Sequence, residues 1–596
     1  MTEIETRLAV DFGSTLTKVV LLKRIQKKWI ITGRGESATT VERPFEDINH
    51  GLENAIREIQ PSQEFKQYYP DPLPKMDNID ITKSGKILAT SSAGGGLKML
   101  VAGVSKTISA ESATKTALGA GAVVQETIAL DDGRQFWEKI ELIKHIQPDL
   151  ILISGGTEKG ATQQLLEIAE IIYKSDLVSR FQSSQKFPII FAGNSCMQSE
   201  IEKSLGKKYL LEFADNIRPS INSENFDSSR EKIRNVFLKH VMSHAPGFDK
   251  IAGLCEIPPL PTPGAVGDFV RLFAKESQKN VLLTDIGGAT TDVFSILDGK
   301  FHKSISANIG MSYSLGNVLF TSKSQNIMRW LPPDISIERA EHYIKNKIFR
   351  PTSIPSLIED LILEQACARE AIRISFQNHL DTMKNSVYQP DRLENSDPFG
   401  NFRSFQALPA VESIDMIIGI GGVFTHAPRY IQKAMIILDS FLPVGICELA
   451  IDRFFLTPQL GVLSKIDSSG ALDLFEREGL QILGTCISPI GIIDNGKCAI
   501  EAKIEDNYGN IYNFRVNSGE VQLWNNALES VVKVVLKCAP KLSLERNPIR
   551  EKISIVKTGK LGLIFDARGR PFFNNLDAET FRKKNQYWTN GLKMYP

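Results

Sequence analysis

Short apolar runs alternate with amphipathic segments along most of this chain. The runs Leu8–Phe12 and Thr17–Leu22 have the length of buried strands and are joined by a short turn. The segment Asp47–Ile59 instead spaces its apolar residues along one face of a helix. Because strands that alternate with helices are typical of α/β proteins, the sequence predicts an α/β fold.

A self-contained pattern of strands and helices begins at Lys86. The predicted strands are Ile87–Thr90, Leu150–Ser154 and Pro188–Ala192, and the predicted helices are Ser109–Ala122 and Gln163–Tyr173. Residues 61–84, rich in Pro, Asp and Lys, predict a linker or long loop before this pattern. We interpret residues 86–215 as an α/β domain that is inserted into the main fold.

More strands are predicted after the proline-rich segment 256–264. They are Val281–Thr284, Asp292–Leu297 and Asp415–Ile420, and a long helix is predicted over Ser356–Asn378. Beyond Leu472 the pattern changes to short strands with Gly, Asn and Asp turns. This change predicts a β-rich domain over residues 475–596.

Length, charge and cysteine content narrow the class of protein. The chain has 596 residues, which is too many for one hydrophobic core. Its 70 Lys and Arg balance 69 Asp and Glu, so it lacks the basic excess usual in nucleic-acid binders. The sequence shows no signal-peptide pattern, no apolar run of membrane length and no CxxC pair. We expect a cytoplasmic protein that binds neither nucleic acid nor a membrane.

The most informative feature is an internal repeat of a strand, a tight turn and a second strand. The matching residues are Asp11 with Asp285, Gly13 with Gly287, and Thr17 with Thr291. A glycine-containing turn directs several backbone N–H groups into one concavity, which suits a phosphate, and hydroxyl groups add donors. An Asp carboxylate beside a phosphate makes sense only with a cation between them, usually hydrated Mg²⁺.

A third glycine turn follows the strand near Ile417. It contains Gly419, Gly421 and Gly422, and the absence of side chains would let adenine and ribose lie on the backbone. His426, just beyond this turn, is a further candidate for ligand contact, with helix capping or solvation as the alternative. Each feature alone is common, but two matched hairpins followed by the glycine turn form a specific combination.

This order resembles the phosphate 1, phosphate 2 and adenosine motifs of the actin, sugar kinase and heat-shock chaperone superfamily. The resemblance implies two ribonuclease-H-like lobes with ATP in the cleft between them. It implies that Asp11, Asp285 and Thr290 are catalytic and that the two aspartates hold Mg²⁺ through water. The implied ATP-binding residues are Gly13, Ser14, Thr15, Thr17, Lys18, Gly287, Gly288, Thr291, Gly419, Gly421 and Gly422.

Further segments resemble one family in particular, the glutamate mutase accessory proteins. This family is called MutL or GlmL-like and is distinct from the mismatch-repair protein of similar name. The segments are Ser91–Ala122, Ser154–Thr157, Phe191–Asn194, Pro261–Pro263, Asp285–Asp292 and Asp566–Pro571. The resemblance spans nearly the whole chain, and it implies a chaperone-like ATPase that reactivates an adenosylcobalamin-dependent mutase.

With this fold we expect five segments. They are the first part of the first lobe (1–85), the inserted domain (86–215), a connecting segment (216–279), the second lobe with the phosphate 2 and adenosine motifs (280–470), and the β-rich C-terminal domain (475–596).

Three other functions stay open from the residues alone. A small-molecule kinase on the same fold would need an acceptor pocket, which the inserted domain could supply. The run Gly13-Ser14-Thr15, followed by Thr17 and Lys18, resembles activator ATPases for dehydratases. Such an activator would need an iron–sulfur cluster held by cysteines shared across a dimer, and the sequence shows no suitably placed pair of cysteines. A non-enzymatic, actin-like scaffold would form filaments with ATP.

Overall fold

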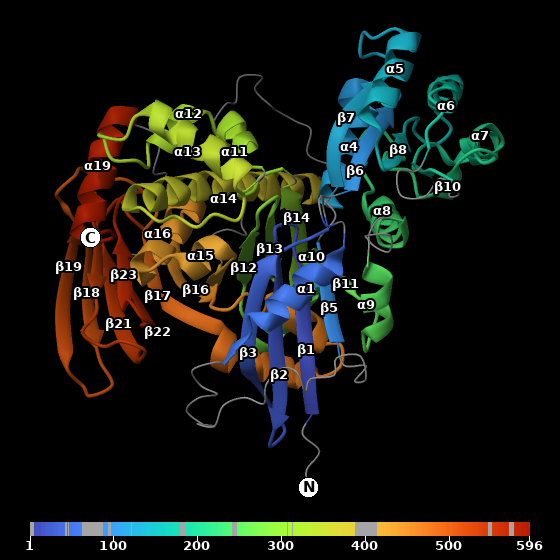
Figure 1. Ribbon diagram of the computed structural model, residues 1–596. Helices are drawn as coiled ribbons and strands as arrows, with labels where there is room; N and C mark the ends of the chain where they lie inside the picture. Colours follow the sequence, from blue (N-terminus) through green and yellow to red (C-terminus); the bar gives the residue numbers. More distant parts are fainter. Residues whose placement is uncertain are drawn as a thin grey trace.

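The structure is a computed structural model. It describes residues 5–41, 45, 47–61, 87–92, 97–120, 122–178, 186–240, 247–306, 308–312, 314–387, 414–545, 551–570 and 577–596. The loop expected at 61–84 lies outside the described residues from 62 onward, as do Ala93–Gly96. Figure 1 shows the inserted domain and the last four-stranded sheet at opposite ends of the molecule, with the two lobes between them.

The first lobe is built on a six-stranded sheet in the order β11-β5-β1-β2-β3-β4. Its strands are β1 (Glu5–Phe12), β2 (Leu16–Ile25), β3 (Lys28–Ala38), β4 (Gln60–Pro61), β5 (Ile87–Ser91) and β11 (Leu260–Pro261). β1, β2 and β3 form an antiparallel meander, whereas β5 lies parallel to β1, and β11 parallel to β5. Helices α1 (Ile48–Arg57) and α9 (Phe248–Leu254) pack against the apolar side chains of one face.

The second lobe repeats this arrangement within an eight-stranded sheet, in the order β14-β13-β12-β15-β16-β17-β23-β20. The repeated strands are β12 (Val281–Ile286), β13 (Thr291–Leu297), β14 (Lys300–Ser306), β15 (Met416–Ile420) and β16 (Gly445–Asp452). The first three form an antiparallel meander, and β15 and β16 continue in parallel beyond β12. Each lobe therefore has a ribonuclease-H-like core, and the α/β class predicted from the sequence is confirmed.

The C-terminal strands do not all form a separate domain, in contrast to the expectation for 475–596. β17 (Leu480–Ser488), β23 (Leu563–Asp566) and β20 (Val521–Trp524) extend the sheet of the second lobe. Only β18 (Cys498–Glu505), β19 (Ile511–Asn517), β21 (Val531–Cys538) and β22 (Glu551–Lys557) form a sheet of their own. This four-stranded sheet buries one face against the extension, because apolar residues from both join one core.

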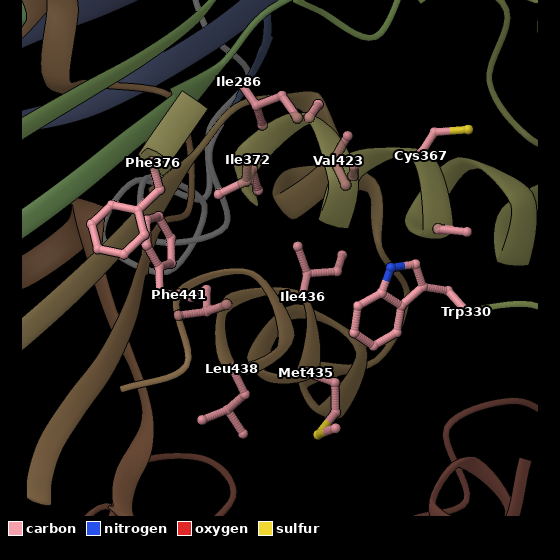
Figure 2. Close-up of a cluster of buried hydrophobic side chains, with 14 of the residues drawn as sticks. Ile286, Trp330, Cys367, Ile372, Phe376, Val423, Met435, Ile436, Leu438 and Phe441 are labelled. Carbon is pink, nitrogen blue, oxygen red and sulfur yellow. The ribbon is translucent and has the colours of Figure 1, made fainter. Parts of the chain in front are cut away.

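Helices cover the other face of the second-lobe sheet. They are α11 (Leu315–Ser322), α12 (Ser324–Met328), α13 (Ile337–Phe349), α14 (Ile358–Val387), α15 (Gly422–His426), α16 (Tyr430–Phe441) and α19 (Ala578–Gly591). Figure 2 shows the core between α14 and α16, where the rings of Phe376 and Phe441 lie 4.9 Å apart in an edge-to-face contact. None of the helices in the described part of the chain is long and apolar enough to cross a lipid bilayer.

The inserted domain has a five-stranded parallel sheet in the order β10-β9-β8-β6-β7. Its strands are β6 (Leu97–Gly103), β7 (Ala122–Ala129), β8 (Leu150–Ser154), β9 (Pro188–Phe191) and β10 (Leu210–Phe213). Its helices are α4 (Glu111–Gly119), α5 (Phe136–Ile146), α6 (Gln163–Lys174), α7 (Gln198–Leu205) and α8 (Asp227–His240). A π-helical turn over Lys106–Ala110 precedes α4. The sequence predicts a helix from Ser109, whereas the α-helix begins at Glu111.

Two predicted boundaries of the insert differ from the structure. The strand at Ile87–Thr90, placed in the insert by the sequence pattern, pairs with β1 and belongs to the first lobe. At the other end, Ile233 and Val236 of α8 pack into the core of the insert, beyond the expected limit at 215. A short apolar strand does not reveal its sheet from sequence, because hydrophobic burial is non-directional.

The two lobes meet at a pair of crossing helices. Helix α10 (Thr262–Ser277), which follows β11, packs against α17 (Thr457–Leu463), which follows β16. Their backbones approach closely, since a Cβ on Gly461 would collide with the carbonyl of Ala265. α18 (Ser468–Leu474) continues the contact to the first lobe, where Trp29 donates a hydrogen bond to Asp467 at 3.0 Å.

The segment Asp566–Arg570 forms a buried ion network at the end of β23. Arg568 contacts Asp566 at 2.8 Å and Asp439 of α16 at 2.7 Å, and Arg570 also pairs with Asp566 at 2.7 Å. Burial acts to raise the pKa of Asp566, but the two arginines outweigh it and hold that pKa well below its usual range. The network joins the C-terminal strands to the helical layer.

Replacing Arg568 with methionine is expected to cost about 1.5–3 kcal/mol of unfolding free energy, because it removes buried hydrogen bonds to the charged groups of Asp566 and Asp439, which keep only Arg570 and Arg369 as partners. Urea unfolding followed by circular dichroism measures the loss. The control is Arg515→Met, which breaks the exposed pair of Arg515 with Glu501 and should cost less than about 1 kcal/mol. Equal effects of the two substitutions would contradict a stabilising role for the buried network.

Candidate functional site

A cavity of about 420 Å³ lies between the two lobes. Both hairpins of the internal repeat and the start of α15 contribute to its wall, so the structure brings together segments that are far apart in the sequence. The predicted site residues that line it are Asp11, Gly13, Ser14, Thr15, Lys18, Asp285, Gly287, Gly288, Thr290, Gly421 and Gly422. His426 lines it too.

Three of the predicted binding residues are not among those that line the cavity. The Thr17 hydroxyl contacts that of Thr39 at 3.1 Å, and the Thr291 hydroxyl donates to the carbonyl of Ile309 at 2.8 Å. Gly419 lies within β15, where a Cβ would press on the ring of Phe424. The two threonines stabilise the hairpins, and Gly419 allows α15 to pack closely. These contacts account for the residue types at the three positions, and no bound ligand is needed to explain them.

The two hairpins have the same turn geometry. The N–H of Gly13 donates to the carbonyl of Leu16 at 3.0 Å, and the N–H of Gly287 donates to that of Thr290 at 2.9 Å. The turns also face each other closely, since a Cβ on Gly288 would collide with the Thr15 hydroxyl. The internal repeat seen in the sequence is therefore a structural duplication whose two copies meet.

The copies differ at the position opposite each aspartate. In the first lobe Asp11 pairs across the strands with Lys18, whereas in the second lobe Asp285 pairs with Asp292. Asp292 also lines the cavity, and the sequence analysis did not single it out as a site residue. Its place in the repeated motif, at the position of Lys18, was the signal that could have identified it.

Asp11 is held by two hydroxyl groups that come from distant parts of the first lobe. Thr90 of β5 donates to its Oδ1 at 2.8 Å, and Thr262, the first residue of α10, donates to the same oxygen at 2.7 Å. Burial raises the pKa of Asp11 despite Lys18 and these two donors. Both hydroxyls fix the orientation of the carboxylate and leave Oδ2 without a hydrogen bond from the described residues.

Two carboxylates of the second lobe each keep one buried oxygen without a hydrogen bond from the described residues. Oδ1 of Asp285 and Oδ1 of Asp292 are buried, and neither has a hydrogen-bond partner among the described residues. Burial, and then the neighbouring charge of Asp292, raise the pKa of Asp285 to about 8. Burial likewise raises the pKa of Asp292, to about 7. Such a pair is costly unless a cation compensates it.

These orphaned oxygens fit a hydrated Mg²⁺, which would be held through its waters by Asp11 and Asp285. The described residues contain no group of three or more His, Cys, Asp or Glu arranged to hold a metal directly. Mg²⁺ commonly keeps several waters and uses one or two carboxylates together with ligand phosphates. The donor set therefore fits a metal that arrives with a phosphorylated ligand.

Lys18 lies over an aromatic ring at the edge of this site. Its Nζ is 3.2 Å from the centre of the Phe455 ring, and burial lowers its pKa even though Asp11 and Asp285 oppose the change. Phe455 has a φ of 57°, a conformation that is unfavourable for a bulky side chain. Asp452 stabilises this turn by accepting hydrogen bonds from Thr457 at 2.7 Å.

Replacing Phe455 with leucine is expected to weaken Mg-ATP binding by about 5- to 30-fold, since a desolvated cation–π contact is worth about 1–2 kcal/mol. Tyrosine at this position should restore binding because it keeps the ring. In a Lys18→Met background the leucine substitution should have no further effect, and calorimetric titration of the four proteins tests this coupling. Additive losses would show that Phe455 only fills space.

The opposite wall of the cavity comes from α13, α14 and the loop between them. Lys347 pairs with Glu364 at 3.2 Å, and it also donates to the carbonyl of Ser353. All three residues line the cavity, together with residues of the loop 351–355. This wall could not be predicted from the sequence, because its residues carry no motif and meet the hairpins only in the folded chain.

The two matched lobes with a cavity at their repeated hairpins define the class of protein: it has the fold of the actin, sugar kinase and heat-shock chaperone superfamily. Within that class the chain belongs to the MutL protein family, whose sequence profile matches residues 7–478. A relative named Protein MutL, from Clostridium tetanomorphum, is 28% identical over 465 residues, which cover 72% of this chain and 89% of that protein.

Solved structures with related folds are more distant. Component A of the (R)-2-hydroxyglutaryl-CoA dehydratase from Acidaminococcus fermentans aligns with a TM-score of 0.26 and 9% identity, over 77% of this chain and 95% of that chain. A glycerol dehydratase reactivase aligns with a TM-score of 0.27 and 10% identity, over 78% of this chain and 100% of that chain.

Proposed function

We propose that this chain is an ATP-dependent accessory protein that reactivates an adenosylcobalamin-dependent mutase of the glutamate mutase type. The proposal that it binds a nucleotide rests on the convergence of two matched hairpins on one cavity, where buried carboxylate oxygens have no hydrogen-bond partner among the described residues. The client part rests on membership of the MutL protein family.

In this proposal each cavity residue has a role that follows from its position. Asp11 and Asp285 hold hydrated Mg²⁺, and the Thr290 hydroxyl and the turn amides at Ser14 and Gly288 donate to phosphate oxygens. Lys18 supplies the positive charge on the side of the first lobe. Bound Mg²⁺ would neutralise charge that develops on the phosphates during hydrolysis.

A nucleotide that touches both lobes can set the angle between them. Its terminal phosphate would bridge the two hairpins, and hydrolysis would remove that bridge. The inserted domain is covalently part of the first lobe, but its helix α4 also packs against β14 of the second lobe. A change in the angle between the lobes would therefore alter the contact between α4 and β14 and with it the position of the insert. A movable insert is suited to act on a client protein.

The nucleotide part is tested by calorimetry with ATP in the presence and absence of Mg²⁺, followed by product analysis. Release of inorganic phosphate without any acceptor is the expected result. Transfer of phosphate to a metabolite would instead establish a small-molecule kinase. Absence of ATP binding in both conditions would refute the assignment of the cavity.

The client part is tested by adding the protein and Mg-ATP to an inactivated adenosylcobalamin mutase from the same cell. Recovery of activity that requires ATP, and that is lost in Asp11→Ala, is the expected result. Linkage also requires that ATP change the affinity for the mutase by the factor with which the mutase changes the affinity for ATP. If no cobalamin enzyme is rescued or co-purifies, the reactivase proposal fails while the nucleotide site stands.

A further inference from the structure

Strand β22 lies at the edge of the four-stranded sheet and presents apolar side chains to solvent. Ile553 is 62% exposed and Ile555 is 76% exposed, both on the face turned away from the core. β21 is its only partner strand among the described residues. The family profile ends at residue 478, so this sheet lies outside the part of the chain that the family shares.

The backbone of β22 offers hydrogen-bonding groups on its outer side. The N–H of Thr558 donates to the carbonyl of Ser530 at 2.9 Å, so these two residues form a hydrogen-bonded pair. In an antiparallel pair of strands, every second residue directs its N–H and C=O toward the partner strand, and the residues between them direct theirs outward. The N–H and C=O groups of Glu551, Ile553, Ile555 and Lys557 therefore point away from β21. The Lys557 carbonyl accepts a bond from the Thr485 hydroxyl at 2.6 Å, whereas those of Ile553 and Ile555 have no partner among the described residues.

The sequence of β22 is complementary to itself in the antiparallel direction. It reads Glu-Lys-Ile-Ser-Ile-Val-Lys from 551 to 557. When two copies pair about Ser554, Glu551 faces Lys557 of the other copy and Ile553 faces Ile555. Neither Glu551 nor Lys557 forms an ion pair with another described residue.

We propose that β22 pairs with β22 of a second copy of this chain, antiparallel and with the two-fold axis at Ser554. The residues that would exchange backbone hydrogen bonds are Ile553 and Ile555, whose N–H and C=O groups point outward. The apolar side chains then cover each other, and the exposed edge is closed. The other edge strand, β19, lacks this symmetry, since pairing about Phe514 would place Arg515 opposite Asn513.

Charge reversal tests the register of the pairing. Sedimentation velocity of the full chain should show a dimer, and Glu551→Lys or Lys557→Glu should each weaken it about tenfold, because each change places like charges opposite each other twice per dimer. The double variant should regain the wild-type affinity. A mixture of the two single variants should form a mixed dimer, because their charges are complementary.

A second variant separates strand pairing from simple apolar contact. Ile553→Pro removes an outward N–H and leaves the bonds to β21, whereas Ile553→Ala removes most of the side chain and keeps the N–H. The proline variant should therefore weaken the dimer about tenfold or more beyond the alanine variant, while thermal unfolding changes little. The control is Lys503→Glu, on the outer face of the central strand β18, which should dimerise as the wild type does.

Several results would overturn the proposal. One is a wild-type chain that stays monomeric at every soluble concentration. Another is a dimer that is insensitive to both charge reversals, which would place the interface elsewhere. Purification of the chain with a different polypeptide bound at β22 would show that the edge serves another partner. The outcome does not depend on nucleotide binding, so it is independent of the proposed function.

Discussion

Asp285→Asn is expected to reduce Mg-ATP hydrolysis by more than about 100-fold, because the substitution removes a carboxylate that holds the hydrated metal. Mg-dependent ATP binding should fall as well. Phosphate release and calorimetry measure the two effects. Asp298→Asn is a matched control, since Asp298 is exposed in the turn at the far end of the same hairpin, and its activity should be unchanged.

The same substitution is not expected to destabilise the fold. Burial and the nearby Asp292 raise the pKa of Asp285 to about 8, so a charged carboxylate is unfavourable there without a cation. Without nucleotide, the asparagine variant should unfold at the same temperature as the wild type or higher. This opposition of stability and activity is expected where a site keeps groups that only a ligand satisfies. Unchanged binding and turnover would refute the phosphate assignment.

Gly422→Val is expected to weaken nucleotide binding by about 5- to 150-fold, the range that about 1–3 kcal/mol of overpacking gives. Gly422 lines the cavity, and a Cβ there would have only the His426 ring nearby, at 3.5 Å. The valine side chain would therefore occupy space that the ligand needs, while the fold keeps its contacts. Fluorescence titration with ATP and a thermal unfolding scan measure both quantities.

Substitution of the neighbouring Gly421 should lower the stability of the fold, whereas substitution of Gly422 should lower nucleotide binding. Gly421 has a φ of 119°, and a Cβ there would collide with the carbonyl oxygen of Ile286. Gly421→Val should therefore cost about 2–5 kcal/mol of stability, and any loss of binding would follow from damage to the turn. If Gly422→Val binds ATP normally, the nucleotide does not lie against α15.

The proposed dimer contact at β22 would lie far from the inserted domain, which is the element proposed to act on the client protein. The insert and the four-stranded sheet lie at opposite ends of the molecule (Figure 1), and the residues that line the cavity belong to the two lobes. Pairing through β22 would leave both the insert and the cleft accessible. We therefore expect dimerisation and nucleotide binding to be independent, as the charge-reversal variants can establish by calorimetry.

The sequence by itself determined the duplicated hairpins and eleven of the residues that line the cavity, with His426 as a further candidate. Asp11 and Asp285 could be found because a strand, a tight turn and the next strand are local in sequence, so spacing alone fixes their geometry. The same holds for the α/β class, since strand and helix periods are also local. The MutL resemblance likewise rested on contiguous segments such as Ser154–Thr157.

Only the tertiary structure decided which distant groups act on those residues. Thr262 reaches Asp11 across 251 residues of sequence, and Phe455 meets Lys18 from the opposite lobe. Thr17 and Thr291 match the repeat, yet their hydroxyls stabilise the hairpins instead of facing the cavity. Likewise, the residues of β5 and β17 do not reveal to which sheet each strand belongs. Apolar burial requires only that a strand be covered, and the partner is chosen by the packing of the whole chain.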